Sequence, residues 1–230
     1  MKQYVAPLYT QQQINELEEN EATDYPLLSP VTLENWHWEG RKKYRPKVQA
    51  EVFAVEGECL SVGLKCWERW PVTTYTNRDD PVYQDSCLEF FIAAKPGDPR
   101  YINIEANSEG VYLLQFGEAR ENRVFLKDLT DNEIIVEPDF SVAPKIARML
   151  FRMVLLPWWS ANIEISLELL KALYGKDYEF YDGMVMRGNF YKCGDKTKIP
   201  HWGAWAPVTT NPPGFHNPEC FGEIILKKVA

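Results

Sequence analysis

Short stretches in which apolar and polar residues alternate run through most of the chain. The clearest covers residues 60–66, LSVGLKC, where every second residue is apolar. Side chains of a β-strand point alternately to its two faces, so this stretch has one apolar and one polar face. It is predicted to be a strand with one buried face.

Further segments of about the same length have strand character and are separated by Gly, Pro, Asp or Asn. Strands are predicted at residues 48–55, 88–93, 101–106, 111–116, 134–137, 148–156, 161–165, 184–192 and 221–228. Only one segment interrupts this series with a clear helical signal, residues 166–175, where Ser166 can cap the start and Gly175 can end the helix. The pattern predicts an all-β fold, a sandwich or barrel, with one short inserted helix.

The chain is predicted to be one domain over residues 1–230, because it has no internal repeat and no shift in composition. The first 35 residues carry acidic clusters and prolines, and they are expected to form a lead-in arm packed on the domain. Within this arm only residues 12–19 have a helical pattern.

Composition narrows the choice of partner. The formal net charge of −8 argues against nucleic acid, whose binding depends on Lys and Arg contacts to phosphate. No stretch approaches the roughly 20 apolar residues of a membrane span. The N-terminus has no apolar export segment, which favours a cytoplasmic location, with export by another route left open. The 8 Trp, 12 Tyr and 11 Phe suit strands and can also stack on sugar rings.

The segment 101–107, YINIEAN, has an apolar face and a face that carries Tyr101, Asn103, Glu105 and Asn107. Amide and carboxylate groups beside an aromatic ring match the hydroxyls and the apolar face of a sugar. The alternative is an ordinary solvated face of a sandwich.

Two acidic residues, Asp85 and Glu89, flank the start of a predicted strand and could orient a ligand. The alternative is structural: Asp85 would accept hydrogen bonds within a turn, and Glu89 would pair with a base such as Arg120. The aromatic and Gly/Pro-rich residues 189–222 hold Trp202 and Trp205, and Trp205 is a further candidate for ligand contact.

Motifs for catalysis, nucleotide binding and zinc binding are absent from the sequence, so no cofactor is predicted. A glycoside hydrolase or lyase that uses Glu89 and Glu105 stays an alternative, because such enzymes need only two suitably spaced carboxyl groups. A third hypothesis is an interaction domain whose aromatic loops bind another protein.

Three blocks give the sequence a family resemblance: residues 84–92 (QDSCLEFFI), 101–107, and 215–224 (FHNPECFGEI). In this order they resemble family 9 carbohydrate-binding modules and their wider relatives, over roughly residues 30–228. The resemblance implies a jelly-roll-like antiparallel β-sandwich, similar to DOMON domains, that binds a mono- or oligosaccharide without cutting it. In the best-known members, which often accompany glycoside hydrolases of polysaccharide catabolism, two tryptophans hold the terminal sugar of a glucan or xylan chain.

The same resemblance assigns positions to the binding site. The two tryptophan positions are occupied here by Tyr83, or Val82 if the register slips by one residue, and by Phe215. Glu89 and either Asn103 or Glu105 would contact sugar hydroxyls, with His216 as an extra donor. Family members also hold structural calcium, which is expected here without assigned ligands.

Overall fold

The computed structural model describes residues 1–22, 25–37, 44–68, 70–141 and 157–230. Its strands are β1 (Gln3–Tyr9), β2 (Val31–Thr32), β3 (Asn35–His37), β4 (Lys47–Val55), β5 (Cys59–Trp67), β6 (Cys87–Ala93), β7 (Tyr101–Asn107), β8 (Tyr112–Gly117), β9 (Val124–Phe125), β10 (Ile135–Phe140), β11 (Trp159–Ser166), β12 (Val185–Cys193), β13 (Trp202–Ala204) and β14 (Gly222–Lys228). The helices are α1 (Gln11–Glu19) and α3 (Leu167–Tyr174), with short 3-10 turns η1 (Val82–Gln84), η2 (Leu126–Asp128) and η3 (Pro218–Cys220).

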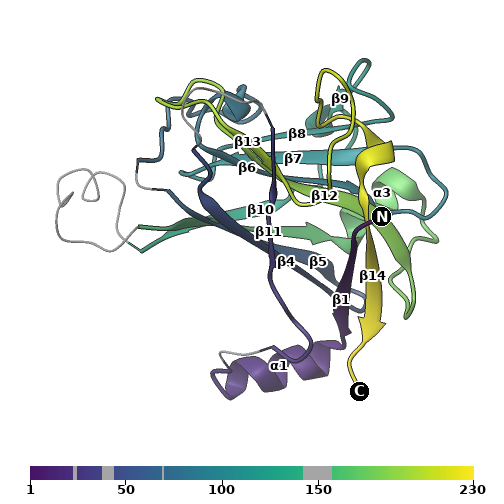
Figure 1. The fold of residues 1–230 in the computed structure, drawn as a ribbon. Helices are drawn as coiled ribbons and strands as arrows, with labels where there is room; N and C mark the ends of the chain where they lie inside the picture. The colour runs from purple at the N-terminus through teal and green to yellow at the C-terminus, as the bar shows by residue number, and fades with distance from the viewer. Residues whose placement is uncertain (23–24, 38–43, 69, 142–156) are drawn as a thin grey trace.

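The strands form one sheet that curls over on itself into a sandwich. Along the sheet the order is β10-β11-β5-β4-β1-β14-β12-β6-β7-β8-β9, with β2, β3 and β13 attached at the side. The two ends of this path make the two layers, β10-β11-β5-β4 and β12-β6-β7-β8, and β1 and β14 connect them (Figure 1). The predicted all-β sandwich with antiparallel layers is therefore confirmed.

The main core lies between the two layers and follows from the alternation in the sequence. In β5, the exposed fraction of Leu60, Val62, Leu64 and Cys66 is at most 1%, and the residues between them are half-buried on the outer face. In β6, Leu88, Phe90 and Ile92 enter the same core from the opposite layer. Each strand of the sandwich thus has a second face that points away from this core.

A polar cluster is enclosed within this apolar core. The Lys192 ammonium lies 3.4 Å from a Glu68 carboxylate oxygen, and both side chains are almost fully buried. The indole N–H of Trp159 donates to the same Glu68 oxygen at 3.2 Å, and the Lys192 ammonium donates to the carbonyl of Cys193 at 2.7 Å. This buried ion pair connects the ends of β5 and β12 across the sandwich.

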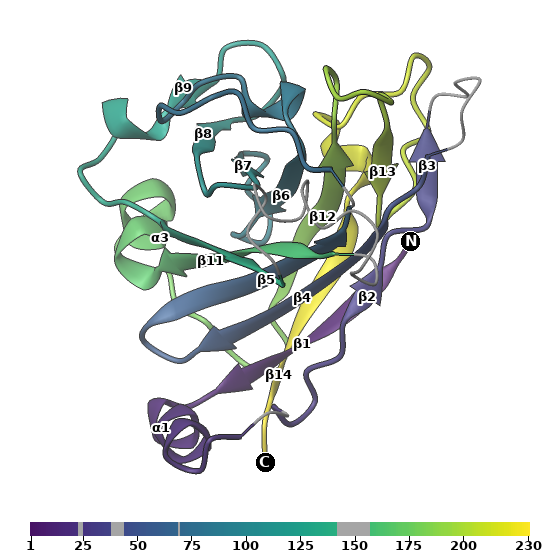
Figure 2. The ribbon, with the colours of Figure 1, turned by 90° about the vertical axis from the view of Figure 1, so that its left-hand side faces the viewer.

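The first residues of the chain differ from the prediction of a lead-in arm. β1 is an interior strand of the sheet, parallel to both β4 and β14, and it buries Tyr4, Ala6 and Leu8 (Figure 2). Helix α1 follows, with a reciprocal capping box between Thr10 and Gln13. Helix α1 covers the helical pattern of residues 12–19, and the predicted inserted helix is α3, with Ser166 and Gly175 as its caps.

Most predicted strands occur within a residue or two of their expected bounds, which is the usual precision of such boundaries. The strand predicted at 148–156 falls in a segment that lies outside the described residues. The described cysteines are all free thiols, and four of the five are buried.

Candidate functional site

Strands β6 and β7 are buried on both faces, and their outer face forms the floor of a pocket. Every residue of both strands is buried, which an exposed sandwich face would not show. Phe91, Tyr101 and Tyr191 of the outer face pack in a second apolar cluster beneath the C-terminal residues 202–221. The alternative of a solvated face for residues 101–107 is therefore wrong.

A pocket of about 340 Å³ opens beside this second cluster. We call it the β6–β7 pocket; its lining is Tyr83, Glu89, Phe91, Glu105, Leu113, Gln115, Arg120, Arg123, Cys193, Asp195, Trp202, Pro213, Gly214, Phe215 and His216. The volume is at the lower end of the range for small-molecule sites. The lining combines aromatic rings with carboxyl, amide, guanidinium and imidazole groups, so it can contact apolar and polar surfaces of one ligand.

Two carboxyl groups stand side by side in this pocket. Glu89 and Glu105 are directly opposite each other on β6 and β7, and both are buried. Among the described residues, Glu89 Oε1 and Glu105 Oε2 have no hydrogen-bond partner. A buried oxygen without a partner is costly, and a ligand hydroxyl that donates to it removes that cost.

Burial also changes the protonation of this pair. It raises the pKa of Glu105 to about 7, against the opposing influence of the Asn103 hydrogen bond and the Arg123 charge. It raises the pKa of Glu89 well above its ordinary range, and the neighbouring Glu105 charge raises it further. Near neutral pH the pair therefore holds at least one proton, and it offers a ligand both a donor and an acceptor.

A hydrogen-bonded chain orients Glu105. The Arg123 Nε donates to Asn103 Oδ1 at 2.7 Å, and Asn103 Nδ2 donates to Glu105 Oε1 at 2.9 Å. The same guanidinium lies 4.1 Å from the ring centroid of Tyr101 and donates to the carbonyl of Tyr101. Asn103 is fully buried and does not line the pocket, so its place is beneath the site.

Aromatic and imidazole rings form the sides of the pocket. Phe215 is buried and stacks on Tyr191, with ring centroids 4.1 Å apart and 14° between the planes. His216 Nδ1 lies 3.0 Å from the Tyr101 hydroxyl, and burial lowers the pKa of His216 to about 3, so the imidazole is neutral. Tyr83, from η1, and Trp202, from β13, are half-buried and line the same pocket.

The sequence-based candidates divide into three groups. Five of them line the β6–β7 pocket together: Tyr83, Glu89, Glu105, Phe215 and His216. Asn103 supports Glu105 from below. Trp205 lies elsewhere and is treated separately.

Trp205 is placed in the main core and does not line the pocket. Its ring centroid lies 5.5 Å from that of Phe190 and 6.5 Å from that of Tyr4, and it packs over Gly222, where a Cβ would overlap the indole. The two tryptophans of this region thus face opposite sides of the layer. Trp202 takes the place at the pocket that was assigned to Trp205.

The structure also tests the alternative roles expected for Asp85 and Glu89. Asp85 is structural, as the alternative predicts, but its bonds are not within a turn: Oδ2 accepts from the backbone N–H groups of Thr74 and Tyr75 in another loop and from Asn107 Nδ2 of β7. No ion pair joins Glu89 to Arg120 in the part of the chain that the structure describes.

Sequence reasoning missed Arg123, Gln115 and Asp195. Each is a lone polar residue, and Arg123 and Asp195 follow strands in loops that carry no motif. The one usable signal is that Arg123 lies in the loop after β8, the strand that pairs with residues 101–107.

A curled β-sandwich with a small pocket, which combines aromatic rings with a buried carboxyl pair, suits a carbohydrate-binding module. The chain belongs to carbohydrate-binding family 9, whose family model matches residues 18–226. No curated protein sequence matches the chain.

Solved structures share the fold. A Bacteroides uniformis protein classed as carbohydrate-binding has 24% identity and a TM-score of 0.71, over 98% of this chain and 99% of that one. Two structures of a family 9 module from Caldicellulosiruptor kristjanssonii also match. The one in complex with cellotriose has 10% identity and a TM-score of 0.61, over 100% of this chain and 95% of that one. The one in complex with glucose has 12% identity and a TM-score of 0.55, over 100% and 97%.

Family membership supports non-catalytic carbohydrate binding and does not favour the hydrolase or lyase alternative. The geometry agrees, because Glu89 and Glu105 are cross-strand neighbours on one side of the pocket, whereas a glycosidase needs its carboxyl groups on either side of the scissile bond. Among the described residues no helix is long and apolar enough to cross a membrane, and no three His, Cys, Asp or Glu residues are grouped to hold a metal ion. Structural calcium stays a prediction.

Proposed function

We propose that the β6–β7 pocket binds a single neutral sugar or the terminal sugar of an oligosaccharide. The observation that carries the proposal is the pair of buried, unpaired oxygens on Glu89 and Glu105 beside the rings of Tyr83 and Phe215. The carboxyl pair would exchange hydrogen bonds with ring hydroxyls, and the aromatic rings would cover the apolar face of the sugar.

The charges of the pocket support a neutral ligand. Three carboxyl groups, from Glu89, Glu105 and Asp195, share the lining with two guanidinium groups. Because the Glu89–Glu105 pair holds at least one proton near neutral pH, at most two carboxylates face the two guanidinium groups, and this near balance of charge selects neither an anionic nor a cationic sugar. The Caldicellulosiruptor module binds cellotriose and glucose in its structures, which makes glucose and β-glucan fragments the first ligands to test.

Isothermal titration calorimetry tests the proposal. Glucose, xylose, mannose, cellobiose, xylobiose and cellotriose are titrated into the wild-type chain and into Glu89→Gln and Tyr83→Ala. We expect binding heat with at least one sugar and about tenfold weaker binding in each variant, since one buried hydrogen bond or ring contact contributes about 1 kcal/mol or more.

Tyr181→Ala is the matched control, because this tyrosine is exposed and does not line the pocket. It should bind the sugar as tightly as the wild type does. The proposal fails if no sugar gives heat, or if Glu89→Gln and Tyr83→Ala bind as well as the control.

A further inference from the structure

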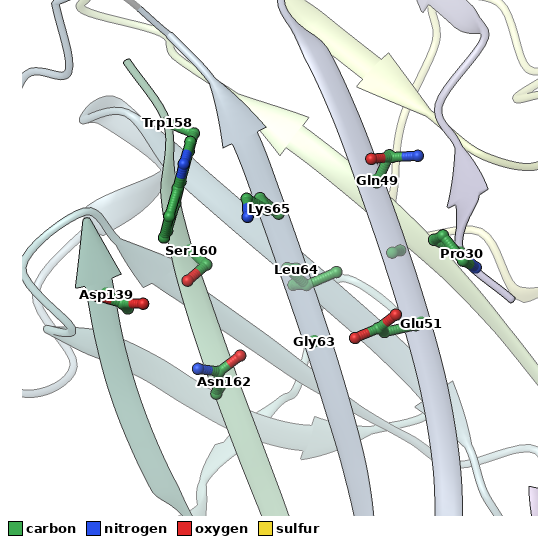
Figure 3. A pocket seen from close by; sticks show the side chains of 11 residues that line it. Pro30, Gln49, Glu51, Gly63, Leu64, Lys65, Asp139, Trp158, Ser160 and Asn162 are labelled. Carbon is green, nitrogen blue, oxygen red and sulfur yellow. The ribbon is translucent and has the colours of Figure 1, made fainter. Parts of the chain in front are cut away.

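A second hollow lies on the opposite outer face of the sandwich, over β4, β5, β11 and β10. It has a volume of about 340 Å³, the same as the β6–β7 pocket. Its floor is the outer face of the layer whose inner face carries Val48, Val62 and Ile163 of the main core. We call it the Gly63 groove, and Figure 3 shows the side chains that line it.

The strand register places polar groups in two rows across this layer. One row runs Gln49, Lys65, Ser160 and Asp139 from β4 to β10. The next row on the same face, two residues along, runs Glu51, Gly63 and Asn162. Three strand spacings separate β4 from β10, roughly 14 Å, so the rows are longer than a single side-chain contact.

Gly63 is the gap in the second row, and its missing side chain shapes the groove. A Cβ at this position would lie 3.0 Å from Cγ and 3.1 Å from Oε1 of Glu51. Because no side chain stands there, Glu51 extends over the strand toward Asn162, and the two side chains point toward each other above Gly63 (Figure 3). A larger residue at position 63 would fill the groove and displace the Glu51 carboxylate.

Four polar side chains of the groove make no hydrogen bond to the described part of the protein. Within the described residues, no hydrogen bond joins the side chains of Gln49, Glu51, Ser160 or Asn162 to another protein group. Ser160 is buried and Glu51 is half-buried, and both line the groove, so their polar groups are available to a ligand that occupies it.

An aromatic wall completes the arrangement. Trp158 is half-buried at the end of the groove, and the ammonium group of Lys65 lies 3.6 Å from the centroid of its ring. This cation–π contact fixes the orientation of the indole beside Ser160 (Figure 3). The Lys65 ammonium therefore covers one face of the indole, and the groove ends at this cation–π pair. Its floor is the backbone at Gly63, and amide, hydroxyl and carboxylate groups lie on both sides.

We propose that the Gly63 groove is a second carbohydrate site, which binds a segment of a neutral oligosaccharide lying across β4, β5 and β11. The groove offers an ammonium donor on Lys65, carboxylate acceptors on Glu51 and Asp139, and side chains that both donate and accept, and sugar hydroxyls can bond with all of these groups. The side chains that do both are those of Gln49, Ser160 and Asn162. Two carboxylates, Glu51 and Asp139, against one ammonium disfavour an anionic ligand. The groove and the β6–β7 pocket open on opposite faces, so one molecule could contact two glycan chains.

NMR spectroscopy of the ¹⁵N-labelled chain tests this proposal. Cellotriose, xylotriose, mannotriose and maltotriose are added in turn, and the indole N–H signal of Trp158 and the amide signals of Gly63 and Asn162 are followed. We expect saturable shifts of these signals with at least one trisaccharide. The shifts should persist in Tyr83→Ala, which alters the β6–β7 pocket alone.

Gly63→Val and Trp158→Ala change the groove from its floor and from its wall. Each should weaken the groove binding at least tenfold and leave the shifts of Glu89 and His216 in the other pocket intact. Asn162 is exposed, so Asn162→Ala leaves the core unchanged, and this third variant should also weaken binding in the groove.

The outcomes separate the two sites. Shifts in the groove signals alone support this second site and contradict the function proposed for the β6–β7 pocket. Shifts of the pocket signals without any in the groove, or groove shifts that survive in Gly63→Val and Trp158→Ala, overturn the second site. If no trisaccharide moves either set of signals, both proposals fall.

Discussion

The carboxyl pair of the β6–β7 pocket makes the stability of the protein depend on pH in an unusual direction. Burial raises the pKa of Glu105 from 4.5 to about 7. Between these values the folded chain keeps a proton that the unfolded chain has released. Stability contributed by this group is therefore highest at low pH, and it is lost as the pH rises through about 7.

The size of the effect follows from the shift. A difference of about 2.5 pKa units corresponds to ~3 kcal/mol of unfolding free energy lost between pH 4.5 and pH 8. Glu105→Gln removes the titration while keeping an oxygen that can accept from Asn103. It also removes a charge that raises the pKa of Glu89, and this change acts in the same direction.

Equilibrium urea unfolding, followed by tryptophan fluorescence at several values of pH from 4.5 to 8, measures the effect. The unfolding free energy of Glu105→Gln, relative to that of the wild type, should rise by about 3 kcal/mol over this range. Glu164→Gln, on the exposed face of β11, is the matched control. If the difference between Glu105→Gln and the wild type stays constant with pH, the reasoning about the buried pair is wrong.

Two further predictions concern the core and the two tryptophans. Lys192→Met should lower the unfolding free energy by about 3–5 kcal/mol, because Glu68 is then buried with the Trp159 hydrogen bond but without a cation. Urea unfolding checks this, and the double variant with Glu68→Gln should recover part of the loss. Trp205→Ala should lower the unfolding free energy by about 3–5 kcal/mol and leave the sugar affinity of the folded molecules unchanged. Trp202→Ala should weaken the sugar binding measured by calorimetry and change the unfolding free energy less. Weaker binding in Trp205→Ala together with a larger loss of stability in Trp202→Ala would contradict their placement.

Period-two alternation was enough to find the strands of the two layers, because each layer has one face in the main core. β4, β5 and β11 could therefore be located from apolar residues alone. β1 could not, since the apolar Val5 and Pro7 stand between Tyr4, Ala6 and Leu8 and hide the alternation. The short strands β2, β3 and β13 are defined by pairing across long separations, and two or three residues hold no periodicity.

The site was predictable where a strand pattern or a family position marked the residue. Glu89 and Glu105 lie on strands whose faces could be read from alternation, and their cross-strand pairing follows from that register. Trp202 and Trp205 could not be told apart, because they lie at the start of the short strand β13 and just after its end. Which indole faces the pocket depends on how β13 pairs with β12 and β3, and the sequence does not mark this pairing. Arg123 depends on the folding of the loop after β8, which the sequence does not specify by any repeating pattern.

A crystal structure of the chain with cellobiose decides whether the β6–β7 pocket is the sugar site. We expect a sugar ring in this pocket, with hydroxyl groups within hydrogen-bond distance of Glu89 Oε1 and Glu105 Oε2 and the ring against Tyr83 or Phe215. A structure at saturating cellobiose in which sugar is found only outside this pocket would contradict it.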